Sequence, residues 1–321
     1  MNTSEKLFLV LAEELNFRRT AEKCFITQQC LSDHIRRLET HYGIRLLNRK
    51  PSVSLTPAGA AVIRTLRQIQ NMEAGLANEL AELENGAAGS LKMGINYTRA
   101  RLILPPLFAR YHARYPHVRL ELVLDETASM EEMLEKGQLD FFLGFNAMEQ
   151  PPLKALPLAQ EHLYLIASKE YVRRYLPEKA DGLLCHREAA DLGDLDGVPL
   201  ITNFSTSTVF QMLHQHLASA HIAIDNILSI SDYFVADGIS RSGCTAFLCP
   251  QIYVPTLLEQ NRLHPPGQKL LAWPVRGLEQ TMRFDLIYNG SIHYPRFARD
   301  CFSLIQEIVR DIDVPLTTGR H

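Results

Sequence analysis

Short apolar runs alternate with helical patterns from Gly89 to the end of this 321-residue chain, and this alternation restricts the fold more than any other feature. The predicted strands cover residues 91–97, 118–124, 139–145, 163–167, 200–203, 227–230, 245–249 and 284–288. Strands that alternate with helices are typical of βαβ units, in which helices cover a mainly parallel sheet. We therefore expect an α/β body that binds ligands at the carboxyl ends of its strands.

Residues 1–56 differ in charge from the rest of the chain. They contain nine Lys and Arg against six Asp and Glu, a net charge of +3, whereas the whole chain carries −3 and the remainder therefore −6. A basic first segment on an acidic body is typical of a protein that meets phosphate at one end only.

The composition predicts a cytoplasmic protein. A hydrophobic fraction of 46% with 21% charged residues is typical of soluble globular proteins. Glu13 and Glu14 interrupt the first apolar segment, so this segment is neither a signal peptide nor a membrane span. The six cysteines form no C-x-x-C pair and no regular framework, and we expect free thiols in a reducing compartment.

Three helices and a wing are predicted at the start of the chain. Apolar residues recur at helical spacing after the candidate N-caps Thr3 and Ser4, which predicts a first helix that ends near Glu14. A second short helix covers residues 17–24, and Thr27 is the expected N-cap of a third helix over residues 28–41. Alternating apolar residues at 44–46 and 53–55 then predict two short strands with Arg49 and Lys50 between them.

The third helix has one apolar stripe and several polar residues near its N-terminal end. Leu31, Ile35 and Leu38 form the stripe, which leaves the polar side chains on other faces. In a recognition helix, Gln and Ser at this end read base edges in the major groove, while Arg and Lys contact phosphate or the minor groove. The candidate DNA-binding residues are Thr27, Gln28, Gln29, Ser32, Arg36, Arg37, Arg49 and Lys50. Periodicity alone is equally compatible with a three-helix unit that does not bind DNA.

A long helix with a heptad-like seam follows from Pro57. The seam consists of Val62, Leu66, Ile69, Glu73, Leu76, Leu80 and Leu83, with Glu73 as its one polar member. This pattern predicts a dimerising helix, and the alternative is an amphipathic helix packed on its own head. The small residues of segment 85–90 (NGAAGS) then predict a flexible hinge.

The first sixty residues resemble the DNA-binding head of LysR-type transcriptional regulators. The resemblance rests on residues 16–22 (NFRRTAE), 26–32 (ITQQCLS), 35–39 (IRRLE), 43–49 (GIRLLNR) and 55–59 (LTPAG), in the correct order. Two positions depart from the family, which usually has Pro or a small residue at Gln29 and Ala at Cys30. The resemblance implies a winged helix-turn-helix that binds double-stranded DNA, with an unusual operator sequence.

The rest of the chain resembles the effector domain of the same family. The matching segments are 104–108 (LPPLF), 115–116 (YP), 137–140 (GQLD) and 248–250 (LCP). The resemblance implies a two-lobed, periplasmic-binding-protein-like α/β effector domain behind an N-terminal all-α winged helix-turn-helix and a long linker helix. We expect the head at 1–58, the linker helix and hinge at 59–89, and the effector domain at 90–321. Lobe one then covers 91–160 and 269–321, and lobe two covers 161–268. A homodimer through the linker helix, assembled further into a tetramer, is also implied.

The turn after the first strand of the body is the expected effector site. Tyr97, Thr98 and Arg99 lie where a strand ends and a helix begins, so that Thr98 presents a hydroxyl beside free N–H groups at a positive helix end. Such a site suits a carboxylate, and the resemblance implies that the hydroxyl at this position holds the effector. N-capping is the other role open to Thr98. The full candidate set, with a second polar turn from the facing lobe, is Tyr97, Thr98, Arg99, Phe145, Thr202, Asn203, Phe204 and Ser205.

Motifs of catalysis and cofactor binding are weak in this sequence. It has no P-loop and no G-x-G-x-x-G, and segment 238–242 (GISRS) lacks the final Gly of a nucleophile elbow. We therefore expect no enzyme activity, no catalytic residue, no metal and no cofactor. The favoured function is transcription regulation by a small-molecule effector, an organic acid. A binding protein or enzyme that shares only the two-lobed body is the rival hypothesis, and such a protein has no use for the basic head and the seam.

Overall fold

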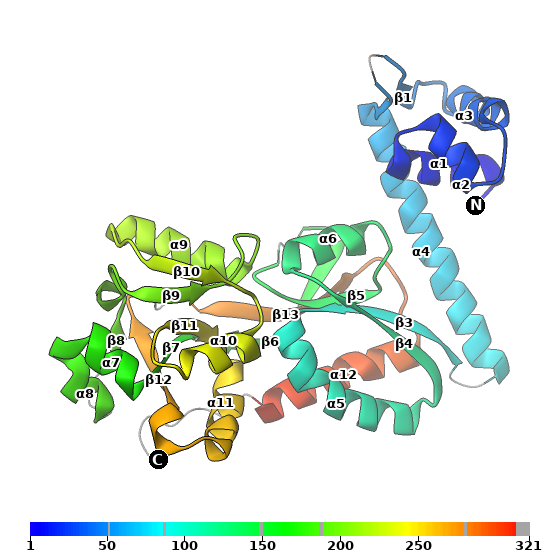
Figure 1. Ribbon diagram of the computed structural model, residues 1–321. Coiled ribbons are helices and arrows are strands. Elements are labelled where there is room, and N and C mark those ends of the chain that lie inside the picture. The colour runs from blue at the N-terminus through cyan, green and yellow to red at the C-terminus, as the bar shows by residue number, and fades with distance from the viewer. Residues whose placement is uncertain (51, 86–87, 148–149, 186–188, 279–280, 313–321) are drawn as a thin grey trace.

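The computed structural model describes residues 1–50, 52–85, 88–147, 150–185, 189–278 and 281–312. A small head, a long helix and a body with two sheets follow one another along the chain (Figure 1). The head contains α1 (Thr3–Glu14), α2 (Phe17–Lys23), α3 (Gln28–Tyr42) and a two-stranded wing of β1 (Leu47–Asn48) and β2 (Ser54–Leu55). These elements follow the predicted helix-turn-helix and wing.

The caps of the head helices explain where these helices begin. The Thr27 hydroxyl accepts a hydrogen bond from the N–H of Cys30 at 3.1 Å, which caps α3 as predicted. The predicted caps of α1, Thr3 and Ser4, are wrong. Asn2 is the cap, because its side chain accepts from the N–H of Glu5 at 3.0 Å while the Glu5 carboxylate accepts from the N–H of Asn2 at 2.7 Å.

The long helix α4 (Pro57–Asn85) runs from the head to the body (Figure 1). Its first turns belong to the head, since Ile63 and Leu66 are buried in the same apolar cluster as Phe8, Leu11 and Ile35. The start of α4 also approaches the backbone of Leu46 closely. Gly59 allows this approach, because a Cβ there would lie 2.0 Å from the carbonyl oxygen of Leu46. The predicted hinge is partly a strand: Gly89 and Ser90 pair with β4, and residues 86–87 lie outside the described residues.

The first sheet of the body has the order β4-β3-β5-β13-β6. It consists of β3 (Ala88–Ile95), β4 (His117–Leu124), β5 (Phe141–Phe145), β6 (Leu153–Glu161) and β13 (Met282–Asn289). Its helices are α5 (Tyr97–Arg114), α6 (Thr127–Glu135) and α12 (Arg296–Ile312). The strands β3, β4 and β5 are parallel, whereas β13 is antiparallel to both of its neighbours.

The second sheet has the order β10-β9-β11-β7-β12-β8. Its strands are β7 (Leu163–Ser168), β8 (Ala190–Asp191), β9 (Pro199–Thr202), β10 (Asp225–Ser229), β11 (Ala246–Pro250) and β12 (Leu270–Arg276). Its helices are α7 (Lys169–Tyr175), α8 (Ala180–Leu184), α9 (Thr208–Ala220), α10 (Tyr233–Ser240) and α11 (Val254–Gln260). Both sheets are mixed rather than mainly parallel, which corrects the expectation.

The described strands place two crossings between the two sheets. The first crossing is at His162, between β6 and β7. The predicted return to lobe one at residue 269 is too early, because β12 pairs with β7 and belongs to the second sheet. The chain returns between Arg276 and Met282, where β12 ends and β13 begins.

Candidate nucleic-acid interface and effector cleft

Helix α3 buries one face and exposes the other. Leu31, Ile35 and Leu38 lie in the core of the head, at 3% exposure or less. The predicted base-reading residues lie outside this core: Thr27, Gln28 and Gln29 are exposed and Ser32 is half-buried. The N-terminal end of α3 therefore presents three exposed polar side chains on a rigid element.

The predicted phosphate-contacting cations are also exposed. Arg36 and Arg37 lie on α3, and Arg49 and Lys50 follow β1 in the wing. Arg49 is partly held in place, since its Nη2 lies 3.5 Å from the Glu39 carboxylate. That carboxylate also accepts hydrogen bonds from the N–H groups of the wing, 3.0 Å from Leu46. Glu39 thereby fixes the wing relative to α3.

The seam of α4 divides into a buried part and an exposed part. Leu66 packs on the head, whereas Ile69, Leu76 and Leu80 are 38%, 55% and 53% exposed in the monomer. The side chain of Leu83 lies outside the described ones. The first turns thus pack on the head, as the second interpretation predicts. The later turns leave apolar side chains uncovered, as a dimerising helix requires, and the dimer through this helix stays a prediction.

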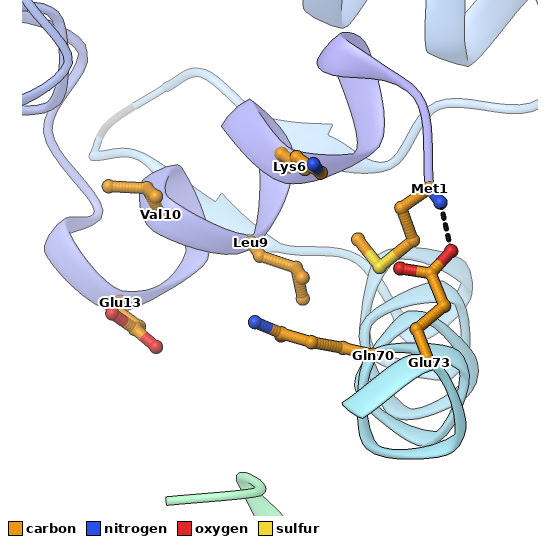
Figure 2. A pocket seen from close by; sticks show the side chains of 7 residues that line it. All are labelled: Met1, Lys6, Leu9, Val10, Glu13, Gln70 and Glu73. Atoms are coloured by element: carbon orange, nitrogen blue, oxygen red, sulfur yellow. Dashed lines mark hydrogen bonds and ion pairs between the residues drawn. The ribbon is translucent and has the colours of Figure 1, made fainter. Parts of the chain in front are cut away.

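Glu73, the polar member of the seam, lines a groove between α1 and α4. Figure 2 shows its carboxylate paired with the amino group of Met1. The groove is lined by Met1, Lys6, Leu9, Val10, Glu13, Gln70 and Glu73. Arg67 and Glu13 add an ion pair at 3.8 Å between the same two helices. The polar break in the seam therefore serves the contact between head and linker helix.

A cleft opens between the two sheets of the body, at the carboxyl ends of β3, β4, β9 and β10. It is lined by Asn96, Tyr97, Thr98, Arg99, Glu126, Thr127, Phe145, Asn203, Ser207, Thr208, Val209, Ser231, Tyr233 and Pro250. Most of these residues are polar. The cavity volume is about 20 Å³, which is room for about one water molecule. A ligand of several atoms therefore requires the walls to move apart.

The first turn of α5 forms one wall. Asn96 is the N-cap and accepts a hydrogen bond from the N–H of Arg99 at 3.0 Å, so Thr98 is not the cap. Thr98 is 2% exposed and lines the cleft. The first turn of a helix leaves N–H groups without partners inside the helix, and its positive end favours an anion. The capping role considered for Thr98 thus belongs to Asn96.

Arg99 is buried beside the cleft in a charged and aromatic environment. Its Nη2 donates to both carboxylate oxygens of Glu161 at 2.8 Å, and each of the two side chains is 1% exposed. The guanidinium carbon lies 3.8 Å from the ring centroid of Phe145 and 4.4 Å from that of Phe284. The Nε and Nη1 atoms of Arg99 are buried and have no hydrogen-bond partner among the described residues. Arg99 is therefore paired in charge but still has unsatisfied donors.

Glu126 contributes a second carboxylate to the cleft wall. It precedes α6, and it lines the cleft together with Ser231 of the other lobe. Burial raises the pKa of this carboxyl above its usual value, and the nearby Asp125 acts in the same direction. An ion pair between the lobes joins Arg101 to Asp232 at 3.2 Å. This ion pair links α5 of one lobe to the residue that caps α10 in the other.

The structure brings together only part of the predicted effector set. Tyr97, Thr98, Arg99, Phe145 and Asn203 line the cleft, whereas Thr202, Phe204 and Ser205 do not. The Thr202 hydroxyl lies beside Ser229 at 3.5 Å, and Phe204 and Ser205 are exposed. Their positions correct the prediction, because the chain turns outward after Asn203 and comes back to the cleft at Ser207. Sequence analysis missed Glu126, Ser231 and Tyr233, which reach the cleft through packing between distant segments.

Within the described residues, no group of three or more His, Cys, Asp or Glu is arranged to hold a metal ion. None of the described helices is both long and apolar enough to cross a membrane.

Comparisons with known proteins agree with this architecture. Residues 84–288 match the LysR substrate binding domain, and residues 5–60 match the bacterial regulatory helix-turn-helix protein of the lysR family. The HTH-type transcriptional regulator CrgA of Neisseria meningitidis serogroup B is 30% identical over 82% of this chain and 88% of its own length. The uncharacterized HTH-type transcriptional regulator YcgK of Bacillus subtilis is 32% identical, over 59% of each chain.

A solved structure extends the likeness to the whole fold. Full-length CbnR complexed with its target DNA has a TM-score of 0.54 and 19% identity, and the match covers 97% of this chain and all of that one. Both matched families and the named relatives are regulators rather than enzymes, which agrees with the absence of catalytic motifs from the sequence. Together the two domain matches, the winged head and the two-lobed body show that this chain is a member of the LysR family of bacterial transcriptional regulators.

Proposed function

We propose that this regulator is a cytoplasmic homodimer that binds an interrupted inverted repeat in duplex DNA and changes this binding when an organic acid enters the cleft. The observation that carries the proposal is the exposed polar end of α3. Its side chains are not part of the apolar cluster that forms the core of the head, so they are available for DNA. The proposed domain limits are those predicted from the sequence, with the return to lobe one moved to between Arg276 and Met282.

DNA binding is supported by the character of the exposed residues on α3 and the wing. Amide and hydroxyl groups at the start of the helix suit base edges, and the cations farther along suit phosphates. The uncovered apolar residues Ile69, Leu76 and Leu80 support a dimer through α4, which would present two heads to two half-sites. The resemblance to the family further implies that two such dimers assemble into a tetramer.

Gln28→Ala and Arg36→Ala should change DNA binding in different ways. A contact to a base edge distinguishes one DNA sequence from another. Gln28→Ala should therefore reduce the difference in binding free energy between operator and random DNA by about 1 to 3 kcal/mol. A phosphate contact carries only affinity, so Arg36→Ala should weaken binding to both DNAs alike. Fluorescence anisotropy on both DNAs measures the two ratios. Lys92→Ala, an exposed charge of the body, is the control and should change neither. Equal specificity ratios in the two head variants would remove Gln28 from the base-reading role.

Effector binding in the cleft is supported by its position and its lining. The walls come from different lobes, so a ligand that touches both changes their separation. The free volume is smaller than any organic acid, so the liganded state must differ from this one in the separation of the walls or in the side chains that line them. A ligand shifts the equilibrium between two arrangements of the lobes only if it binds one arrangement more tightly than the other. The size of the shift is set by this difference in affinity.

Replacing Thr98 with Val should weaken effector binding about ten- to hundred-fold. Valine keeps the shape but removes the hydroxyl, and a lost hydrogen bond to a charged group costs about 1.5 to 3 kcal/mol. DNA binding without effector should survive, because Thr98 lines the cleft of the body and is not part of the head cluster. Calorimetry with an effector found by a thermal-shift screen of metabolites measures the change. Thr206→Val, an exposed position outside the cleft, is the matched control. An unchanged effector affinity in Thr98→Val would place the site elsewhere.

A further inference from the structure

The wall formed by α5 offers hydrogen-bond donors to a carboxylate. The first turn of this 18-residue helix contributes its N-terminal N–H groups and the Thr98 hydroxyl. Behind them lie the Nε and Nη1 atoms of Arg99, which are buried and unpartnered. A buried donor without an acceptor is costly, so an acceptor that reaches this wall would be favoured. This wall alone suits any organic acid.

The net charge of the cleft argues against a simple acid. The positive charge of Arg99 is already balanced by Glu161, which holds it through two contacts at 2.8 Å. Glu126 then adds a carboxylate with no ion pair among the described residues, and the charge of Arg99, which acts on Glu126 electrostatically, is already balanced by Glu161. Asp125, the residue before Glu126, adds to the negative potential at the Glu126 carboxylate. A ligand that has a carboxylate but no ammonium group would place its negative charge near the carboxylate of Glu126, and the two charges would repel each other.

We propose that the effector is an α-amino acid or a close analogue, whose carboxylate binds the first turn of α5 and whose protonated amine faces Glu126. The inference rests on the proposed effector site and deepens it. The two groups of such a ligand are adjacent, and Thr98 and Glu126 line the same narrow cavity. The ammonium balances Glu126 while the carboxylate meets the donors of α5, so each charged group of the ligand has an opposite partner.

A panel of matched ligands tests this assignment on the full chain. The twenty proteinogenic amino acids are compared with the acids that lack the amine and with the amines that lack the carboxylate, by thermal shift and then calorimetry. At least one amino acid should bind at least about tenfold more tightly than both of its truncated analogues. If no amino acid binds, or if a deaminated acid binds as tightly as its parent, the assignment is wrong.

A variant of the acidic wall separates the two charges of the ligand. Glu126→Gln keeps the shape and removes the charge, so it should weaken the amino acid at least about tenfold and leave or improve binding of the deaminated acid. Glu135→Gln, exposed at the far end of α6, is the matched control and should change neither. An unchanged amino-acid affinity in Glu126→Gln would contradict the role of Glu126. If this variant does not fold, the ligand panel on the unaltered chain still decides.

The same panel, repeated with DNA present, distinguishes this inference from the proposed function. If an acid without an amine binds and changes DNA binding, the regulator function stands and the amino-acid assignment fails. If the chain does not bind duplex DNA at all, or if Thr98→Val leaves all ligand binding unchanged, the failure lies in the proposed function or in the site itself.

Discussion

Glu161→Leu should destabilise the body by about 3 to 5 kcal/mol, because it leaves the buried Arg99 charge without a counter-ion. Arg99 is 1% exposed and packs against the rings of Phe145 and Phe284, so bulk water cannot take the place of the lost carboxylate. The double variant Arg99→Met with Glu161→Leu removes both charges and should recover most of this loss, since apolar side chains of similar volume often replace a buried ion pair at little cost. Urea unfolding followed by tryptophan fluorescence measures both, because the single Trp273 is buried in the body.

An exposed ion pair provides the control for this prediction. Glu132 of α6 and Lys136, the C-cap of this helix, lie 3.0 Å apart, with side chains 70% and 39% exposed. Breaking this pair with Glu132→Gln should change stability by no more than about 1 kcal/mol. A Glu161→Leu variant as stable as Glu132→Gln would mean that the Arg99 charge reaches solvent, and the account of the cleft wall would then be wrong.

DNA affinity should fall about 10³- to 10⁵-fold between 50 and 200 mM salt. Such a fall accompanies about 6 to 10 phosphate contacts, because each neutralised phosphate releases counter-ions. Arg36, Arg37, Arg49 and Lys50 of each head are exposed and supply this number when two heads bind. Anisotropy titrations across a salt series measure the slope. The variant Arg36→Ala should make this slope shallower, while Gln28→Ala should leave it unchanged. A slope near zero would contradict the assignment of the head.

The parts of the fold that local spacing controls were predictable from the sequence. Thr27 was recognised as the cap of α3, and the stripe of Leu31, Ile35 and Leu38 was recognised as core, because both follow from contacts within one or two helical turns. The cap of α1 was missed because Asn2 and Glu5 form a capping box one residue before the expected caps.

Two of the strands that sequence analysis missed, β6 and β12, share a physical cause. β6 contains Pro157 and β12 contains Pro274, and proline argues against a strand because it has no N–H for the ladder. Both strands tolerate it here: β6 is at the edge of its sheet, and Pro274 lies outside the short stretch that pairs with β8. Without β12 the return between the lobes was placed too early.

The candidate site was predictable only where one turn builds it. Tyr97, Thr98 and Arg99 follow β3 directly and line the cleft, as a strand-to-helix turn predicts. Glu161 is 62 residues from its partner Arg99, and Glu126 reaches Ser231 only because the two lobes meet. No periodicity or motif signals such pairs, so the charge balance of the cleft became visible only in the folded chain.

Footprinting of the full chain on the DNA upstream of its own gene, with and without a bound effector, tests the central claim most directly. The account predicts protection of two half-sites related by an inverted repeat, one for each head of the dimer, and a change in the protected length or in affinity when effector is added. Protection of a single half-site, or a footprint and an affinity that no cleft ligand alters, would contradict the claim that the body controls the head.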